Sequence, residues 1–481
     1  MSDYEARRQQ HVARAVTLAP RLIEQLDWPA ERLAAYRTAR LRKLARTATM
    51  RSRWYRERLA DVDIERLDIT TLAGLPVLTK TELMEHFDDI VTDPRLSLAQ
   101  VEHHLSTVET GSYLFDRYTA ITSGGSTGRR AVFVYGWDSW TVFWLSLMRG
   151  VLRVKLADPM LAGRPAVLAS AAAAHFSHAT AAMARTFSGA HLTSIRLPVT
   201  LPAEQIVAGL NQAQPDFLLA YPSVLHVLAH EAAAGRLRIA PRRIMAGAEP
   251  LLPEIRAAAE QAWGMNVINI WGTSEGGGTA VGCDRGSTHI SEDQVIVEPV
   301  DLAGRPVAPG ERSAKVYLTN LYNSALPLIR YEITDEVTVL PDRCPCGSAH
   351  RRIADVQGRL DDVFVYQGRR VHPHLFRSEL GREAGVIEYQ VRQTPAGAAI
   401  AVRCRAPVSL DSIRDRVAAA LARAGLERPQ VTVEIVDRLE RPGGPAKLKR
   451  FIPLGPDSEP SGPAWPGPSA PGPRAVVSAG R

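Results

Sequence analysis

One short segment of the chain has an unusual density of groups that bind phosphate. Residues 123–128 read SGGSTG, and Arg129 and Arg130 follow directly. Glycines allow successive backbone N–H groups to point to one side, while hydroxyl and guanidinium groups add donors and positive charge. The spacing fits neither the G-x-x-x-x-G-K-[ST] loop nor the G-x-G-x-x-G dinucleotide motif. The residues alone leave two alternatives, a phosphate-binding loop of another kind or a surface turn.

Five further motifs follow this loop along the chain. They are AGAEPL (246–251), NIWGTSEGGG (269–278), LPLIRYEITDE (326–336), QGRLDD (357–362) and PGGPAKLKRF (442–451). Their carboxylates suit a divalent cation or a ribose diol, because hard cations prefer oxygen ligands and one carboxylate accepts hydrogen bonds from two neighbouring hydroxyls. A lysine on a glycine-rich loop can stabilise negative charge that develops during a reaction. Taken singly, Glu249 is equally well an exposed loop acid, and Asp335 or Asp361 half of a surface salt bridge.

The order and spacing of the six motifs resemble the adenylate-forming enzymes, which include acyl- and aryl-CoA ligases, luciferases and peptide-synthetase adenylation domains. The segment YRERLADVDIERLDITTLAGLPVLTKTEL (55–83) resembles the phenylacetate–CoA ligase branch of that superfamily. The resemblance runs from roughly residue 40 to residue 454. It implies that a carboxylate attacks the α-phosphate of ATP, that pyrophosphate leaves, and that the acyl group then passes to coenzyme A.

The resemblance assigns the β- and γ-phosphates of ATP to the glycine-rich loop. The residues concerned are Ser123, Gly125, Ser126, Thr127, Gly128 and Arg129. Three positions depart from the common pattern: Gly124 replaces Ser or Thr, Arg129 replaces Lys, and Arg130 replaces Pro. An arginine supplies the same charge as a lysine through a planar fork, so we expect the loop to keep its function.

The resemblance also implies the remaining nucleotide contacts. They are Ala248, Glu249, Trp271, Gly272, Thr273, Ser274, Asp335 and Arg359. Ala248 and Glu249 pack against adenine, and Trp271 stands in place of the common Tyr and can stack on the base. Ser274 bonds the α-phosphate, and Glu275 binds Mg²⁺. Asp335 holds both ribose hydroxyls, and Arg359 adds a ribose or phosphate contact.

The last motif contains the expected catalytic lysine. The family spacing is Lys-x-x-Arg just after a small residue, which Lys447 and Arg450 fit and Lys449 does not. Pro445 and Ala446 stand between the glycines and this lysine, a small departure. We expect Lys447, with Glu275, to carry the adenylation step, because its charge meets the negative charge that builds at the α-phosphate.

The acid and its final acceptor are left open. The branch favours aryl and arylacetic acids, and we expect Trp137, Trp140, Gly247 and Gly276 to line the acyl pocket. The tryptophans, with Trp144, are equally compatible with core positions at helical spacing. The acceptor is coenzyme A by resemblance, with an amine or a carrier protein as the alternative. A catalytically silent nucleotide-binding protein is a third alternative, against which the intact acidic and lysine motifs argue.

The cysteines have a spacing that suits zinc. Cys283-x5-His289 and Cys344-x-Cys346 supply three thiolates and one imidazole, a complete tetrahedral set without an open position. The phenylacetate–CoA ligase branch includes members with the same spacings at these points. We predict a structural zinc site, the alternative being buried thiols without a metal. Cys404, within a strand-like run, is expected in the core.

The pattern of apolar runs predicts an α/β fold with two domains. Between 115 and 340, strand-like runs such as AVFVYG and KVYLTNL alternate with alanine-rich helical segments, while the part near 293–340 looks more like consecutive strands. The expected large N-terminal adenylation domain spans 1–358, beginning with a largely helical lead-in (1–115), and is built from mixed sheets and helices. The resemblance implies a hinge at 359–361, with Asp361 as the hinge residue, before a small mobile α+β domain at 362–455. In that domain two strand-like runs precede the helical segment LDSIRDRVAAALARAG and one follows it. Residues 456–481 are rich in Pro, Gly and Ser, and we expect them to be disordered.

The bulk properties exclude some classes of protein. The chain has 481 residues, a net charge of +7 and 45% hydrophobic residues, an ordinary globular composition. The arginine-rich residues 1–60 are either an RNA-binding arm or a helix with a solvated basic face, and the lack of interleaved aromatics favours the helix. We see no export signal and no membrane span, and expect a cytoplasmic enzyme of small molecules without a nucleic-acid partner. The oligomeric state is open, a homodimer being one alternative.

Overall fold

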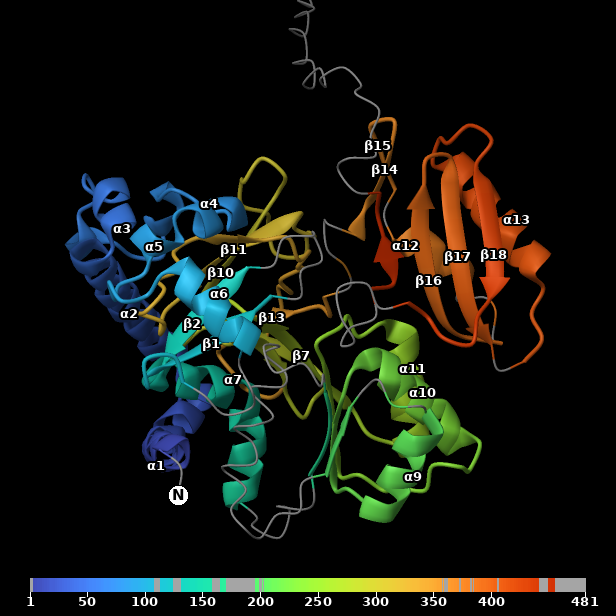
Figure 1. Ribbon diagram of the computed structural model, residues 1–481, viewed down its shortest axis with the longest axis horizontal. Helices are drawn as coiled ribbons and strands as arrows, with labels where there is room; N and C mark the ends of the chain where they lie inside the picture. The colour runs from blue at the N-terminus through green and yellow to red at the C-terminus, as the bar shows by residue number, and fades with distance from the viewer. Residues whose placement is uncertain are drawn as a thin grey trace, which may run out of the picture. The chain divides into compact units, whose positions relative to one another are not determined.

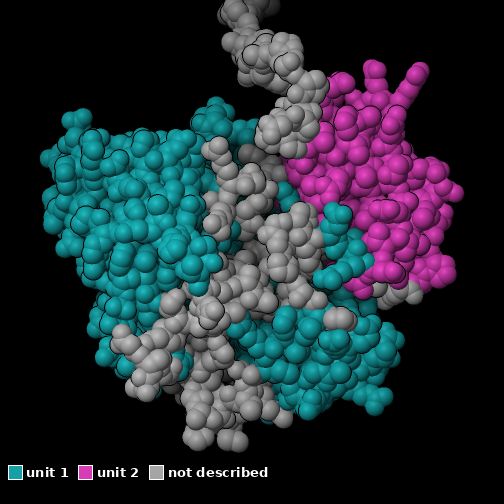
Figure 2. Space-filling model, in the orientation of Figure 1, with its two compact units in different colours: residues 1–361, 438–449 teal, residues 362–437, 450–481 magenta. Residues whose placement is uncertain are grey.

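The computed structural model divides the chain into two compact units. The first comprises Met1–Asp361 with Arg438–Lys449, and the second Asp362–Asp437 with Arg450–Arg481 (Figure 2). The sequence-based limits instead place residues 438–449 in the small domain. The structure describes residues 3–107, 113–123, 131–157, 165–169, 195–198, 201, 203–356, 358, 362–371, 373–380, 383, 385–404, 406–440 and 449–454.

The first unit begins with a series of helices, drawn in blue in Figure 1. They are α1 (Asp3–Glu24), α2 (Ala30–Arg51), α3 (Arg53–Arg58), α4 (Lys80–Glu85), α5 (Phe87–Ile90) and α6 (Leu98–Thr107). Leu33, Leu41 and Leu44 of α2 are buried, as their helical spacing predicts, while most of its basic side chains lie on the other faces. The structure therefore agrees with the helix alternative for the basic N-terminal region. Over the described residues, every helix is too short or too polar to span a lipid bilayer.

The segment at 55–83, which resembles one branch of the family, is fastened to the body of the first unit. The Leu78 N–H donates to the carbonyl of Arg330 at 3.1 Å, and the Glu332 N–H donates to the carbonyl of Leu78 at 2.9 Å. The buried Arg330 guanidinium donates to the carbonyls of Ala73 and Leu75. Arg330 has a φ of +50°, a strained value that its many bonds maintain. The described contacts give this segment a structural role.

An eight-stranded mixed sheet forms the centre of the first unit, in the order β13-β9-β8-β7-β6-β5-β3-β4. The strands are β3 (Pro165–Ala169), β4 (Ile195–Pro198), β5 (Phe217–Ala220), β6 (Arg243–Gly247), β7 (Val267–Thr273), β8 (Gly277–Gly282), β9 (Thr288–Ile290) and β13 (Arg352–Ile353). The run from β4 to β7 is parallel, and its crossovers contain α9 (Ala203–Ala213), α10 (Pro222–Ala233) and α11 (Pro253–Trp263). The carboxyl ends of parallel strands meet at one edge, where α/β proteins commonly bind ligands.

Two smaller sheets complete the first unit. β1 (Tyr118–Thr122) and β2 (Val132–Gly136) form an antiparallel hairpin, followed by α7 (Trp137–Ala157). β10 (Val295–Val300), β11 (Lys315–Asn320) and β12 (Tyr331–Ile333) form an antiparallel sheet. The expected strands at AVFVYG and KVYLTNL are thus present, but in sheets separate from the central one. The mixed sheets with helices confirm the predicted fold class.

The second unit is a small α+β module with its own core. It contains β14 (Phe364–Tyr366), β15 (Arg369–Val371), α12 (His374–Leu380), β16 (Val386–Thr394), β17 (Gly397–Cys404), α13 (Leu410–Arg423), β18 (Gln430–Ile435) and β19 (Phe451–Ile452). Its four-stranded sheet has the order β18-β17-β16-β19. Phe364, Phe376, Val391 and Ile413 are buried in one cluster between sheet and helices. Cys404, expected in the core, is half-buried at the end of β17 and packs against that cluster.

Candidate functional site

The glycine-rich loop lies between β1 and β2 in the chain, and hydrogen bonds between Ser123 and Ala131 close the base of this loop. The Ser123 N–H donates to the carbonyl of Ala131 at 2.9 Å, and the Ala131 N–H donates to Ser123 Oγ at 2.9 Å. These bonds extend the β1–β2 ladder by one pair, so they define where the loop starts and ends. Ser123 was predicted to bind phosphate, and the structure adds a role in holding the base of the loop. The other predicted phosphate ligands (Gly125, Ser126, Thr127, Gly128 and Arg129) lie outside the described residues.

The WGTSE motif lies beside the base of this loop. Ser274 Oγ is 3.5 Å from the carbonyl oxygen of Thr122, the last residue of β1. The hydroxyl of Tyr135 in β2 donates to the carbonyl of Ser274 at 2.5 Å. Burial, reinforced by Tyr322 and the charge of Glu275, raises the pKa of Tyr135 well above its usual value, so this phenol stays a donor. The structure thus brings together two motifs that are far apart in the chain, since Thr122 and Ser274 are 152 positions apart.

The turn after β7 is held by its own polar side chains. Thr273 Oγ1 accepts from the Gly276 N–H at 2.9 Å and lies 2.9 Å from Thr279 Oγ1. The carbonyl of Glu275 accepts from the Asn320 side-chain amide at 2.7 Å. Glu275, the predicted Mg²⁺ ligand, is therefore half-buried on a fixed backbone. A fixed carboxylate is suited to a metal site because little ordering remains to be done on binding.

The glycine run 276–278 has a packing reason that sequence reasoning missed. A Cβ on Gly277 would lie 2.7 Å from Ser146 Oγ, and a Cβ on Gly278 would lie 2.7 Å from the Ser146 carbonyl oxygen. The Gly278 N–H donates to Ser146 Oγ at 2.6 Å. A Cβ on Gly276 would lie 2.9 Å from Thr279 Oγ1. Close approach of α7 thus requires Gly277 and Gly278, and the neighbouring Thr279 restricts Gly276, which we expected to line the acyl pocket.

The other predicted acyl-pocket residues lie in packed surroundings. Trp140 is in the hydrophobic core, which agrees with the alternative that these tryptophans are core residues at helical spacing. The Trp137 ring stacks on the His11 ring, with centroids 5.4 Å apart and planes 6° from parallel. Gly247, at the end of β6, sits where a Cβ would be 3.2 Å from the Ile270 Cβ. For Gly247, a close approach between β6 and β7 is thus a sufficient reason for glycine.

The GAEP motif follows β6 with a strained residue and a helix cap. Ala248 has a φ of +72°, a left-handed conformation that is costly for a residue with a Cβ and is often found at functional sites. Glu249 Oε2 accepts from the Ser223 N–H at 2.9 Å, in the first turn of α10. A carboxylate is favourable there because the first N–H groups of a helix lack partners within it. This role of Glu249 was missed, since Ser223 is distant in sequence.

Asp335, the predicted ribose ligand, is bonded to Trp271, the predicted adenine contact. The Trp271 indole N–H donates to Asp335 Oδ2 at 2.7 Å. The two residues are 6% and 2% exposed. The next residue, Glu336, donates its N–H to the carbonyl of Gly358 at 3.2 Å, which brings the start of the GRLDD motif to the same place. Arg359 and Asp361 of that motif, and the predicted catalytic Lys447, lie outside the described residues.

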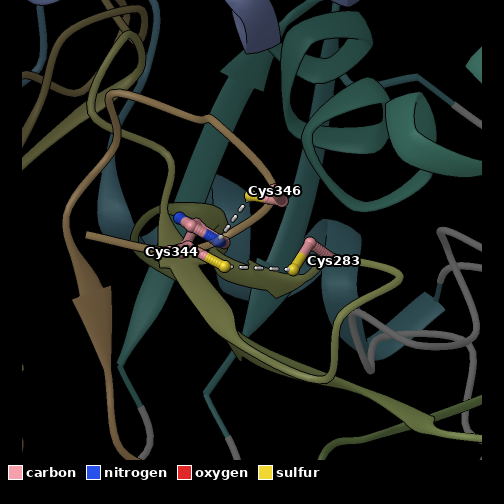
Figure 3. Close-up of side chains that lie close together, drawn as sticks. Cys283, Cys344 and Cys346 are labelled. Carbon is pink, nitrogen blue, oxygen red and sulfur yellow. Dashed lines mark hydrogen bonds between the residues drawn. The ribbon is translucent and has the colours of Figure 1, made fainter. Parts of the chain in front are cut away.

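The four predicted zinc ligands form one cluster (Figure 3). The ligand atoms of Cys283, His289, Cys344 and Cys346 all lie within 4.8 Å of one another. Cys283 Sγ is 3.8 Å from Cys344 Sγ, and Cys346 Sγ is 3.4 Å from His289 Nε2. Tetrahedral zinc, with bonds of about 2.3 Å to sulfur and about 2.0 Å to nitrogen, separates two sulfurs by about 3.8 Å and a sulfur and a nitrogen by about 3.5 Å. The donor set and its spacing therefore fit zinc.

The histidine of this cluster is oriented for ligation. His289 Nδ1 lies 2.9 Å from the carbonyl oxygen of His350, which makes Nδ1 the protonated nitrogen. The lone pair of Nε2 then points toward Cys346. Such a bond on the far side of the ring is the usual support of a metal-binding histidine. The cluster joins the end of β8 and β9 to the turn before β13.

Comparison with known proteins agrees with this site. Residues 114–314 match the family model for AMP-binding enzymes, a range that includes the loop, GAEP and WGTSE motifs. This part of the chain is therefore similar to AMP-binding enzymes. The chain is 26% identical over 360 residues to a phenylacetate-coenzyme A ligase of Thermus thermophilus, covering 72% of this chain and 74% of the relative. It is 33% identical over 202 residues to a phenylacetate-coenzyme A ligase of Pseudomonas putida, covering 38% of this chain and 44% of the relative.

Solved structures support the fold of this chain. A 2-hydroxyisobutyryl-CoA ligase in the postadenylation state, in complex with 2-HIB-AMP, superposes with a TM-score of 0.68 at 19% identity, over 89% of this chain and 91% of that one. The same ligase with R3-HIB-AMP gives a TM-score of 0.67. At this identity the likeness establishes the fold alone.

Proposed function

We propose that the protein is an ATP-dependent ligase that activates a carboxylic acid as its acyl-adenylate. In the first step a carboxylate oxygen bonds to the α-phosphorus of ATP, the bond from that phosphorus to the bridging oxygen of the β-phosphate breaks, and pyrophosphate leaves. In the second step the thiol sulfur of coenzyme A bonds to the acyl carbon, the bond to the phosphate oxygen breaks, and AMP leaves.

The observation that carries this proposal is the meeting of separate nucleotide motifs in the described part of the first unit. Ser274 lies at the base of the glycine-rich loop, while Trp271, three residues earlier, bonds Asp335. A single ATP can then contact the loop through its β- and γ-phosphates, Ser274 through its α-phosphate, and Asp335 through its ribose. The GAEP and WGTSE motifs lie at the carboxyl ends of parallel strands β6 and β7, the usual ligand edge.

The carboxylate of Glu275 fits Mg²⁺. It is half-buried, its backbone is held by Asn320, and it follows Ser274, the proposed α-phosphate contact. Oxygen donors of this kind suit a hard cation that shares its other positions with phosphate and water. The bound cation would supply positive charge to the phosphates. Lys447 adds charge at the α-phosphate, and Arg359 adds a further nucleotide contact.

The substrate is proposed to be an aryl or arylacetic acid, and the acceptor coenzyme A. The support is that the curated relatives are named phenylacetate-coenzyme A ligases. The Cys283–His289–Cys344–Cys346 cluster is proposed to hold a structural zinc, since all four positions are filled by protein ligands. In the proposed enzyme the zinc stabilises the β8–β9 region, and catalysis is left to the nucleotide site.

The decisive experiment is acid-dependent exchange of labelled pyrophosphate into ATP, across a panel of aryl, arylacetic and aliphatic acids. We expect exchange with at least one aromatic acid and no exchange without an acid. Adding coenzyme A should then yield the thioester and AMP. Exchange with no acid of the panel would contradict adenylation, whereas exchange without thioester formation would contradict only the acceptor.

A further inference from the structure

The bond between Trp271 and Asp335 is a directed contact between two nucleotide motifs. The indole N–H lies 2.7 Å from Asp335 Oδ2, and both side chains are buried. The indole nitrogen can only donate and an ionised carboxylate can only accept, so the direction of the bond is unambiguous. Charge-assisted bonds of this kind are stronger and more directional than neutral ones, and burial strengthens them further.

Trp271 is itself held rigidly. It belongs to β7, pairs with Ala280 of β8, and its side chain is part of the main hydrophobic core. The register between β7 and β8 shifts just after it, between Trp271 and Gly272. Irregularities of this kind aim side chains near active sites. The indole therefore presents its N–H from a fixed position.

The backbone around Asp335 is also fixed. Two residues before it, β12 ends at Ile333. On the other side, the Glu336 N–H donates to the Gly358 carbonyl at 3.2 Å, and the Val337 N–H donates to Ser313 Oγ at 2.9 Å. With the backbone set, the remaining freedom of Asp335 is rotation of its carboxylate. The indole N–H restrains that rotation.

We propose that Trp271 is a positioning residue, whose indole N–H orients the Asp335 carboxylate for the two ribose hydroxyls of ATP. The inference rests on the proposed function, because it concerns the same nucleotide site. It goes further by making recognition of the ribose depend on the N–H of Trp271 and not on its ring alone. A carboxylate selects a diol only if its plane matches the two hydroxyls, and a site built to bond hydroxyls rejects analogues that lack them.

The test separates the two roles that Trp271 could have. The variant Trp271→Phe keeps an aromatic ring for stacking on adenine but removes the N–H. Dissociation constants are measured by calorimetry for ATP, 2′-deoxy-ATP and 3′-deoxy-ATP, and KM and kcat by pyrophosphate exchange. In the wild type we expect ATP to bind at least about tenfold more tightly than either deoxy nucleotide, and in Trp271→Phe we expect ATP binding to weaken about tenfold while the deoxy nucleotides change little. In exchange, KM for ATP should rise far more than kcat falls.

Three controls make the outcome decisive. Trp54→Phe makes the same replacement at a buried tryptophan of α3, so it reports any general effect of losing an indole. Asp335→Asn keeps the shape of the side chain but removes its charge, and should abolish the ribose preference. The double variant should then lose little more than Asp335→Asn alone, because the two residues act as a unit. Thermal unfolding of each variant checks that it is folded.

Preserved preference for ATP over the deoxy nucleotides in Trp271→Phe would overturn the inference, as would fully additive losses in the double variant. A uniform loss for all three nucleotides would also overturn it, since that is the result expected from stacking alone. The binding measurements need no acid and no turnover. A wild type that binds ATP with a ribose preference but fails to exchange pyrophosphate would therefore contradict the proposed function alone. The inference about Trp271 would still be tested by the dissociation constants.

Discussion

At the scale of single residues, the candidate nucleotide site is organised before any ligand binds. Two of its described residues are held by a directed bond from outside their own motifs: the backbone carbonyl of Ser274 accepts from Tyr135, and the carboxylate of Asp335 accepts from Trp271. Groups fixed in this way need little reorganisation as charge develops, which is how most of the rate of phosphoryl chemistry is obtained. The same logic applies to Lys447, the proposed catalytic lysine.

Lys447→Ala should lower acyl-adenylate formation by about 10²–10³-fold, the usual loss for removing one charge-stabilising donor. Its ammonium group meets negative charge that exists only while the carboxylate attacks the α-phosphate. Thioester formation from chemically prepared acyl-AMP should change little. In that half-reaction the carboxylate no longer attacks the α-phosphate, so the negative charge that Lys447 would stabilise does not develop. The two half-reactions are measured separately, by pyrophosphate exchange and by CoA-dependent release of AMP.

The matched control is Lys449→Ala, two residues along, which fails the Lys-x-x-Arg spacing. We expect it to retain both half-reactions. If Lys449→Ala instead loses adenylation and Lys447→Ala keeps it, the assignment of the catalytic lysine must be exchanged. Equal loss of both half-reactions in Lys447→Ala would assign the residue a general role in binding.

At the scale of elements, α1 is docked on α7 through a buried histidine. His11 Nε2 lies 2.8 Å from both the Trp137 carbonyl oxygen and Thr141 Oγ1, and Nδ1 lies 3.1 Å from the Tyr113 hydroxyl. Burial lowers the pKa of His11 below its usual 6.5, although the bond to Trp137 and the charge of Asp138 act in the opposite direction. The neutral ring is therefore part of the helix contact.

Stability should fall with acidity because of this histidine. Above pH 6.5 the ring is neutral in both states, so its contribution is complete. As the pH falls below that value the unfolded chain binds the proton first, which favours unfolding until the folded ring is protonated as well. The unfolding free energy, measured with urea between about pH 8 and about pH 5, should fall more steeply in the wild type than in His11→Gln. Identical slopes would show that His11 is not the group responsible.

The Cys283–His289–Cys344–Cys346 cluster lies where β8 and β9 meet the turn before β13. β9 and β13 pair over only two residues at the edge of the central sheet, Thr288–Ile353 and His289–Arg352. We expect purified protein to contain about one zinc per chain, because a complete tetrahedral set is present. Cys283→Ser should lose most of the metal and lower the melting temperature by about 4 °C or more, since 1 kcal/mol already shifts it by about 2–4 °C.

Cys404→Ser is the matched control for that experiment, because Cys404 lies in the second unit, apart from the cluster. It should retain the zinc and nearly all of the stability. Metal analysis by mass spectrometry on both variants distinguishes the outcomes. Wild-type protein without zinc would remove the metal from the proposal and favour the alternative of unliganded thiols.

At the scale of the whole molecule, the sequence predicts the fold class and the residues of the candidate site. It predicts less well which strands pair and which site residues contact one another. The strand-like runs before and after LDSIRDRVAAALARAG are the strands β16, β17 and β18 around α13. Short apolar runs reveal strands but not their partners, so the placement of β2 and β11 in separate sheets could not be predicted. Pairing depends on contacts between distant residues, which periodicity does not record.

The same limit explains the missed site contacts. Trp271 and Asp335 are 64 positions apart, and Glu249 and Ser223 are 26 apart. Trp271, Asp335 and Glu249 were identified from their motifs and Ser223 was not, and the bonds between these residues follow from the fold alone. One missed contact could have been suspected from the sequence. Asn320 is a polar amide at the end of the apolar strand KVYLTN, and a buried amide needs a hydrogen-bond partner, which is the Glu275 carbonyl in the structure.

The end of the second unit leads to the last prediction, which concerns truncation. β19 is the edge strand of its sheet: Phe451 and Ile452 pair in parallel with β16, and the Phe451 ring lies 6.4 Å from that of Phe364. The final described contact is the Leu454 N–H donating to the Gln393 side chain at 3.2 Å. Deleting residues 456–481 leaves all these contacts in place, whereas deleting 449–481 removes the strand and its buried aromatic ring.

We therefore expect the shorter deletion to leave adenylation, thioester formation and the melting temperature unchanged to within about 1 °C, because substitutions away from core contacts usually change stability little. The longer deletion should destabilise the second unit, because loss of a buried phenylalanine alone costs about 3–5 kcal/mol. Activity assays and thermal unfolding of both truncations provide the measurement. A large loss of activity in the shorter deletion at unchanged stability would assign the Pro/Gly/Ser-rich segment a direct role in the reaction.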